Sequence, residues 1–147
     1  MHPEYFKTRF RVERDVSAWP EGFAIISAFA TTGQQWTDAE NDAADRRLEN
    51  ELRYAGIWYA RITGFSPETG HAEPSWAVEM GFQEACGIGE RYRQDAIYYV
   101  EGDALYVSYC NAHRALIPVD SFRSRIDKPD TNGIRTKDIT REEGRRS

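Results

Sequence analysis

"GFAIISAF", residues 22–29, is a continuous apolar run bounded by Pro20 on one side and by Thr31, Thr32 and Gly33 on the other. A short run of this kind, enclosed by turn-forming residues, is typical of a strand that is covered on both faces. Such a strand has no wet side and therefore lies inside a sheet. We expect residues 22–29 to form the central strand of the fold.

The segments on either side of this run predict a strand and a helix. Residues 5–12 (YFKTRFRV) alternate apolar and basic side chains, which predicts an edge strand or an extended arm with one wet face. Thr37 and Glu40 form a capping box and Gly56 supplies a C-terminal cap, so residues 37–56 predict a helix. Its narrow apolar stripe consists of Ala44, Leu48, Leu52 and Ala55.

The outer face of this helix is densely charged. The pattern is typical of a solvated surface with local ion pairs, such as Asp42 with Arg46 and Glu49 with Arg53. An acidic face that binds a partner is the alternative.

The rest of the chain adds strands and a second helix. Aromatic and β-branched residues predict strands at 57–63 (IWYARIT), at 75–80 (SWAVEM) and, as a hairpin around Gly102, at 95–110. Two prolines and two glycines break regular structure at 64–74, so "GHAEP" is predicted to be a loop. A helix is predicted at 82–94, where Gly87 and Gly89 indicate close packing against the sheet.

This order predicts an α+β fold, namely a two-layer sandwich with ferredoxin-like βαββαβ topology and an added C-terminal strand. Residues 1–127 are expected to form a single domain, of which 1–20 is an N-terminal extended arm. Apolar residues become sparse in 128–147, which predicts a mobile polar tail.

Composition limits the possible partners. The net charge of −5 argues against nucleic acid as the main partner, and no apolar run is long enough to span a bilayer. The N-terminus lacks the apolar core of a signal peptide, and Cys86 and Cys110 show no metal-type spacing. We therefore expect a cytoplasmic protein with free thiols, without a cofactor, a bound metal or a membrane contact. The oligomeric state is not predicted.

Familiar catalytic patterns are incomplete in this chain. His71 and Glu73 match the His-x-Glu of zinc deaminases, but the required Pro-Cys-x-x-Cys does not follow. Ser75 with His71 and Glu73, and Cys110 with His113, are near neighbours in sequence, for which a surface or structural role is the more common interpretation. The hairpin tyrosines could stack nucleic-acid bases, although such residues more often form cross-strand pairs.

Four polar residues stand at junctions between predicted elements, and in a two-layer domain they could converge at one rim. They are Asn41, Glu73, Ser75 and Gln94. Converging groups of this type can bind a polar ligand. The same residue types also hydrogen-bond to free backbone groups at helix ends and in loops, and the sequence favours this structural interpretation.

The segments "FAIISAF", "AEN", "EPSW" and "YRQDAIYYV" together resemble an uncharacterised bacterial and phage family, domain of unknown function 3293, over residues 22–108. Glu40, Asn41, Glu73, Ser75 and Gln94 match that pattern. The family tends to place an Asn-Pro-like turn after the first strand, where this chain has "AFATTGQQW". The resemblance implies a shared domain and a shared polar rim, but no reaction.

Two hypotheses of function follow. The first is a small binding module that recognises a protein or a small polar ligand through Asn41, Glu73, Ser75, Trp76 and Gln94. Such a module would suit a phage or plasmid accessory protein that inhibits a host defence factor. The second is an enzyme acting on a nucleotide-like small substrate, with Glu73 as general acid or base and His71 assisting.

Overall fold

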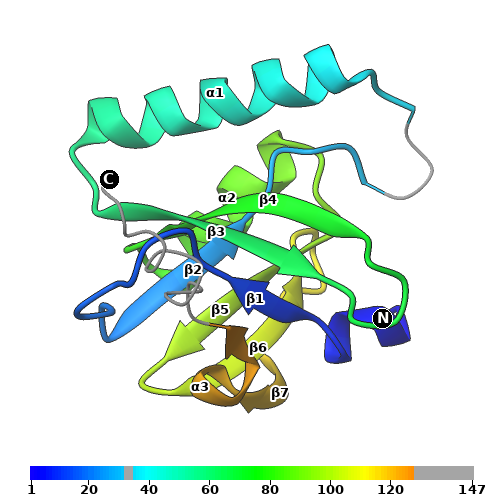
Figure 1. Ribbon diagram of the computed structural model, residues 1–147. Helices are drawn as coiled ribbons and strands as arrows, with labels where there is room; N and C mark the ends of the chain where they lie inside the picture. Colours follow the sequence, from blue (N-terminus) through cyan, green and yellow to red (C-terminus); the bar gives the residue numbers. More distant parts are fainter. Residues whose placement is uncertain (32–34, 128–147) are drawn as a thin grey trace, which may run out of the picture.

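The computed structural model describes residues 1–31 and 35–127, which form an α+β fold built on one curled sheet (Figure 1). Its strands are β1 (Arg9–Arg11), β2 (Gly22–Ile26), β3 (Tyr59–Phe65), β4 (Ala72–Val78), β5 (Ala96–Glu101), β6 (Ala104–Tyr109), β7 (Ile117–Ser121) and β8 (Ile126–Asp127). Its helices are the 3-10 helix η1 (Pro3–Phe6), α1 (Asp38–Ala55), α2 (Phe82–Arg91) and α3 (Phe122–Arg125). The predicted α+β class is confirmed.

The described strands follow the order β7-β6-β5-β2-β4-β3-β1-β8. β2 lies between β4 and β5, and both pairings are antiparallel, so the prediction of an internal first strand is confirmed. The sheet is larger than predicted, because β1, β7 and β8 extend it. β8 pairs in parallel with β1, so the sheet is mixed and β1 is not an edge strand. The predicted tail at 128–147 lies outside the described residues.

Both faces of the sheet carry an apolar core. Ala24 and Ile26 of β2 face α1 and α2, where Leu48, Leu52 and Ile88 cover them. The alternate residues of β2, Phe23 and Ile25, belong to a second cluster on the opposite face. There, Phe10, Trp19, Leu105 and Phe122 close the curled sheet on itself, with the rings of Phe23 and Phe122 5.2 Å apart. The predicted two-layer sandwich, with helices covering one face of the sheet, does not include this second core.

The first helix forms as its sequence predicts. The Thr37 side chain accepts from the Glu40 backbone N–H, the Glu40 side chain accepts from that of Thr37, and Gly56 ends the helix at φ 72°. Ala44, Leu48 and Leu52 are buried, but Ala55 is exposed.

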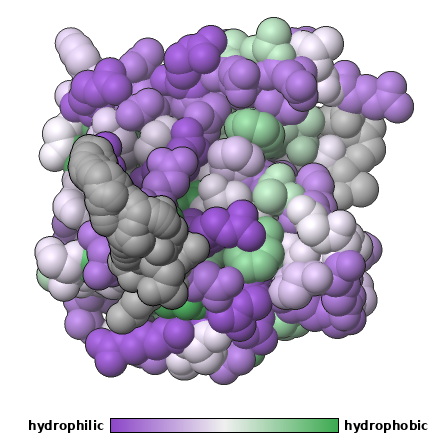
Figure 2. Space-filling model, viewed as in Figure 1, coloured by the Kyte–Doolittle hydropathy of each residue, from purple (hydrophilic) through white to green (hydrophobic). Residues whose placement is uncertain are grey.

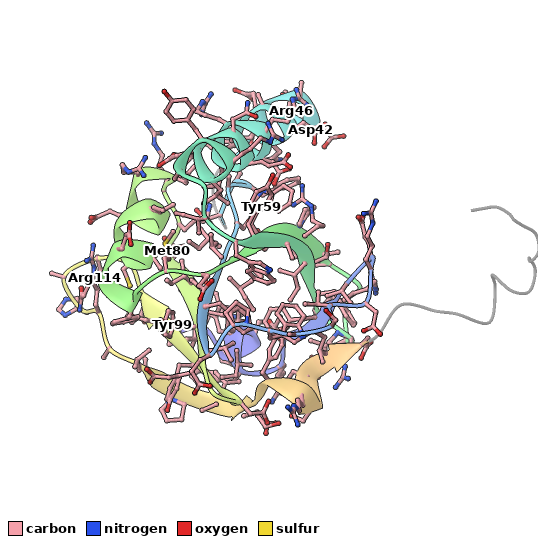
Figure 3. The ribbon with its side chains drawn as sticks, turned by 90° about the vertical axis from the view of Figure 1, so that its left-hand side faces the viewer. Asp42, Arg46, Tyr59, Met80, Tyr99 and Arg114 are labelled. Atoms are coloured by element: carbon pink, nitrogen blue, oxygen red, sulfur yellow. The ribbon has the colours of Figure 1, made fainter. Side chains whose placement is uncertain are left out.

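The outward face of α1 is hydrophilic (Figure 2). Asp42 and Arg46 lie on this helix (Figure 3) and are both exposed. Of the two predicted ion pairs, Glu49 with Arg53 forms at 3.3 Å. Asp42 with Arg46 is not among the ion pairs between described residues.

A mostly buried ion pair connects α1 to the sheet. Arg61 of β3 donates to both carboxylate oxygens of Asp45, at 3.0 and 2.5 Å, and to the Ser75 carbonyl at 3.1 Å. Its guanidinium also lies 3.6 Å from the centroid of the Trp76 ring. Arg61 therefore links α1, β3 and β4 through one side chain.

The second helix packs closely at one of its two glycines. A Cβ on Gly89 would lie 2.5 Å from Cys110 Sγ and 2.8 Å from Ile97 Cγ2, whereas one on Gly87 would meet nothing within 4 Å. Close packing is thus confirmed for Gly89 but not for Gly87. The helix ends at Arg91, three residues earlier than predicted at Gln94.

Within the described residues, no helix combines the length and apolarity needed to cross a membrane.

These two glycines make a matched pair for mutation. Gly87→Ala should raise the free energy of unfolding by about 0.5–1 kcal/mol, since alanine favours the helix and meets no neighbour. Gly89→Ala should lower it by about 1–3 kcal/mol, since its methyl group overpacks the interface with β5. Urea denaturation followed by circular dichroism measures both changes. Equal effects at the two positions would contradict this packing.

The link through Arg61 is tested by removing its counter-charge. Asp45→Asn should lower the free energy of unfolding by about 2–3 kcal/mol, because a mostly buried guanidinium loses its carboxylate. Replacing both partners, Asp45→Leu with Arg61→Met, should recover much of that loss. Glu49→Gln, which breaks the more exposed pair on the same helix, is the control and should have little effect.

Candidate functional site

A cleft of about 740 Å³ opens beside η1 at one end of the sheet. Its lining comes from segments far apart in the chain. They are η1, β1, the ends of β2, β3 and β6, the starts of β4 and β5, and the residues that join α2 to β5. Antiparallel pairing explains this convergence, because strands that end here have neighbours that begin here.

The structure brings together part of the predicted polar rim. Glu73, Ser75 and Gln94 line the cleft, and so does His71. Asn41 and Trp76 are not part of its lining. The sequence therefore predicted one side of the site, while its other walls come from segments that the prediction did not include.

The two remaining rim residues have structural contacts. The Asn41 amide oxygen accepts from the Ala30 backbone N–H at 2.8 Å and so ties the loop after β2 to α1. Trp76 lies on the helix-covered face of the sheet, because adjacent residues of a strand point to opposite sides and Ser75 faces the cleft side. Its indole N–H is buried and meets no acceptor among the described residues.

Glu73 belongs to the strand itself. The predicted loop "GHAEP" ends earlier than expected, since β4 begins at Ala72 and Glu73 pairs with Gly64 of β3. Pro74 fits within this strand opposite Thr63, and its carbonyl accepts from the Ser27 hydroxyl at 3.1 Å. The carboxyl of Glu73 is consequently held by a rigid element.

The environment of Glu73 disfavours its charged form. Burial raises the pKa of the Glu73 carboxyl to about 7, and the neighbouring Ser27 hydroxyl offsets this rise in part. Among the described residues, no lysine, arginine or histidine forms an ion pair with it. Glu73 thus changes protonation near neutral pH.

Two tyrosines complete the surroundings of this carboxyl. Burial, followed by the charges of Asp95 and Glu73, raises the pKa of Tyr5 to about 12, and all three residues line the same cleft. Tyr98 donates to the Tyr5 backbone carbonyl at 2.7 Å, and burial raises its pKa strongly as well. Both phenols therefore remain protonated at neutral pH.

Ser75 and Gln94 already have partners within the chain. The Ser75 hydroxyl donates to the Glu73 carbonyl at 3.2 Å. The Gln94 amide donates to the carbonyls of Phe29 and Tyr92, at 2.7 and 3.2 Å, and fixes the loop that follows β2. For Gln94 this supports the structural interpretation, and Glu73 stands out as the carboxyl with a changed pKa.

The other catalytic patterns find less support. His71 is exposed, and burial raises the pKa of the Cys110 thiol to about 12, which makes it a poor nucleophile at neutral pH. Tyr98 and Tyr99 face opposite sides of the sheet. Tyr99 donates to the Met80 carbonyl at 2.9 Å on the helix side (Figure 3). Residues 1–31 and 35–127 contain no group of three or more His, Cys, Asp or Glu side chains that could hold a metal.

Several residues that line the cleft were not predicted from the sequence to be site residues. Ser27 carried a signal, since it is the polar residue within the apolar run at 22–29. Tyr98 was considered only as one of the hairpin tyrosines that could stack bases. Tyr5 and Asp95 carried no signal, because η1 was predicted to be extended and the folding of η1 against β5 depends on long-range contacts.

Residues 26–97 match the model of a family described as "Protein of unknown function (DUF3293)". The matched segment runs from the end of β2 into β5 and includes Ser27, Glu73, Ser75 and Gln94. The resemblance predicted from the sequence is thereby confirmed. No curated protein and no solved structure matches the chain significantly.

The position of Glu73 predicts a pH-dependent stability. Its pKa is 4.5 when exposed and about 7 in the folded chain, so the folded state binds more protons between these values and loses stability as the pH rises through them. Glu73→Gln should therefore raise the free energy of unfolding by about 2 kcal/mol at pH 8 and change it little at pH 4.5.

The exposed Glu79, just after the same strand, offers the control Glu79→Gln, which should show no such dependence. Urea denaturation at the two pH values measures both variants. An equal effect of Glu73→Gln at pH 4.5 and pH 8 would show that the carboxyl is well solvated in the folded state.

Proposed function

We propose that the protein is a binding module that holds a small polar ligand in the cleft beside Glu73. The observation that carries this proposal is a cleft of about 740 Å³ with a desolvated carboxyl in its wall. Pockets of this size accommodate metabolite-sized molecules, and they usually combine aromatic and apolar walls with a few fixed polar groups.

The lining has this character. Tyr5, Phe10, Phe65 and Tyr98 provide aromatic surface, and Glu73 stands among them on a strand that pairs on both sides. Burying a carboxyl without a basic partner destabilises the folded state. A group that is retained at such a cost commonly serves function, and a ligand that bonds to it would offset the desolvation.

A second candidate is an enzyme in which Glu73 acts as general acid or base. The pKa of about 7 favours it, because a group that is half-ionised at neutral pH can both take and give a proton. Tyr5 and Tyr98 would then be neutral hydrogen-bond donors near the reacting atoms. His71, which is exposed at the rim, could assist only with a ligand that reaches the outer end of the cleft.

Three further predictions from the sequence, namely the ferredoxin-like topology, the cytoplasmic location and a protein ligand, are part of this proposal. The order β5-β2-β4-β3, with every pairing antiparallel, supports a ferredoxin-like centre within the larger sheet. The free thiols Cys86 and Cys110 support a reducing, cytoplasmic location. A protein ligand, as for an inhibitor of a host defence factor, would have to insert a side chain or chain end into the cleft.

A fragment screen by ¹H–¹⁵N NMR tests the proposal. Fragments that bind should shift the amides of Glu73, Ser75 and residues 94–98. Glu73→Gln should weaken the binding of fragments that contact the carboxyl at least tenfold, as expected for loss of a charged hydrogen bond. Glu84→Gln, in the separate groove between α1 and α2, is the control.

A screen in which fragments bind only outside the cleft would refute the binding module. Spectra of each bound fragment recorded again after a day separate the two candidates, since turnover that is lost in Glu73→Gln would establish the enzyme.

A further inference from the structure

The charges that line the cleft are unequal in sign. Its lining includes the carboxylates of Glu4, Glu73, Glu90 and Asp95, against the single guanidinium of Arg93 and the imidazoles of His2 and His71. Glu90 is paired with Arg114 at 3.4 Å. The carboxylates of Glu4, Glu73 and Asp95 form no ion pair with any residue that the structure describes.

The basic groups do not neutralise the inner part of the cleft. Arg93, His2 and His71 are all exposed. His2 Nδ1 accepts a hydrogen bond from the Glu4 backbone N–H, which requires that nitrogen to be unprotonated. The basic side chains of the described lining are therefore exposed, and Arg125, whose charge reaches Tyr98 from outside the lining, is paired with Asp120 at 3.1 Å.

Aromatic rings form much of the inner wall. The Tyr98 ring meets Phe10 edge-on with centroids 5.1 Å apart, and Tyr5 meets Tyr98 at 6.3 Å. Ring faces attract cations, most strongly where water is excluded. The chain itself uses this attraction at the cleft border, where the Arg11 guanidinium lies 4.3 Å from the centroid of the Phe65 ring.

Two carboxylates act on the same part of this wall. Asp95 lies just before β5 and is exposed, whereas Glu73 lies in β4. The charges of both raise the pKa of the Tyr5 hydroxyl, and all three residues line the cleft. The two carboxylates approach Tyr5 from separate elements, so a group placed beside this hydroxyl would interact with both. An anion there would meet two like charges, and an uncharged ligand would leave the Glu73 carboxylate without a counter-charge.

We infer that the ligand of this cleft is a small organic cation, an ammonium or guanidinium compound, whose charged end lies beside Glu73 and Asp95 and whose hydrocarbon part packs on Tyr5, Phe10 and Tyr98. The inference rests on the proposed binding function and names the chemical class that the cleft accepts. The ligand supplies the positive charge that the described chain does not place beside Glu73.

Four probes of similar length separate the possible classes. Agmatine and 1,4-diaminobutane are cations, 1,4-butanediol is the uncharged analogue, and succinate is the anion. In ¹H–¹⁵N NMR titrations at pH 8, both cations should shift the amides of Glu73, Ser75 and residues 94–98 and should bind at least tenfold more tightly than butanediol. Succinate should not bind in the cleft.

Two variants and a change of pH locate the interaction. Glu73→Gln and Asp95→Asn should each weaken agmatine about tenfold and leave butanediol unchanged, while Glu79→Gln should alter neither. Binding of agmatine should strengthen about tenfold from pH 6 to pH 8, as Glu73 ionises, and Glu73→Gln should remove most of this dependence. The other charged groups of the lining, Glu4, Glu90, Arg93, Asp95, His2 and His71, are the same in both proteins.

The inference is overturned if butanediol binds as well as the cations, if succinate binds in their place, or if neither cation binds at about 20 mM. It is also overturned if the cations bind only to the acidic outer face of α1. In each of these cases, a fragment of other chemistry bound in the cleft would preserve the proposed function. An empty cleft in both experiments would refute both proposals.

Discussion

Burial of residues 23–28, in β2 and just after it, is the constraint on which the rest of the structure depends. Every side chain from Phe23 to Ala28 is buried, so apolar partners are required on both faces of the sheet. α1 and α2 provide them on one face. On the other, the sheet has to curl, and Phe10, Trp19 and Phe122 from distant segments fill the concave side. The added strands β1, β7 and β8 are a consequence of this second core.

The same constraint locates the cleft. At Ser27 the buried segment becomes polar, and its hydroxyl bonds to the Pro74 carbonyl and accepts from the Phe29 N–H. From this point the chain leaves the sheet for α1, and the second core ends. Glu73 occupies the next part of the cleft wall on β4, whose position Arg61 fixes by bonding to the Ser75 carbonyl. The ion pair that holds α1 thus also stabilises the strand that carries the site.

Local chemistry made some elements predictable from the sequence. The capping box of Thr37 and Glu40, the αL cap at Gly56 and the turn at Gly102 each depend on a few adjacent residues, and each is present. The wall of the cleft depends on long-range packing. η1 contacts β5 through the hydrogen bond from the Tyr98 hydroxyl to the Tyr5 carbonyl, which joins residues 93 positions apart. No periodicity in either segment predicts this contact.

The two errors at the predicted rim, Trp76 and Asn41, have separate origins. Pro74 and Gly70 suggested a loop up to residue 74. A proline, which lacks a backbone N–H, is nevertheless compatible with a strand at a position where no neighbour needs that donor, and β4 begins at Ala72. Once Glu73 is in the strand, alternation assigns Ser75 to its side and Trp76 to the other. Asn41 was assigned to the rim because it opens a helix, yet that position is also where a side chain best ties down the preceding loop.

Glu73 connects stability, pH and binding through a single desolvation energy. Burial that raises its pKa penalises the carboxylate, and the penalty grows as the pH increases toward 7. A cation that pairs with the carboxylate removes this penalty, so its binding must lower the pKa of Glu73 and release a proton on average at neutral pH. A general acid or base uses the same property in the opposite sense, because it requires that both protonation states persist in the complex. The cleft can therefore bind a permanent cation tightly at Glu73 or retain a proton-transfer group with a pKa near 7, but one and the same bound state cannot do both.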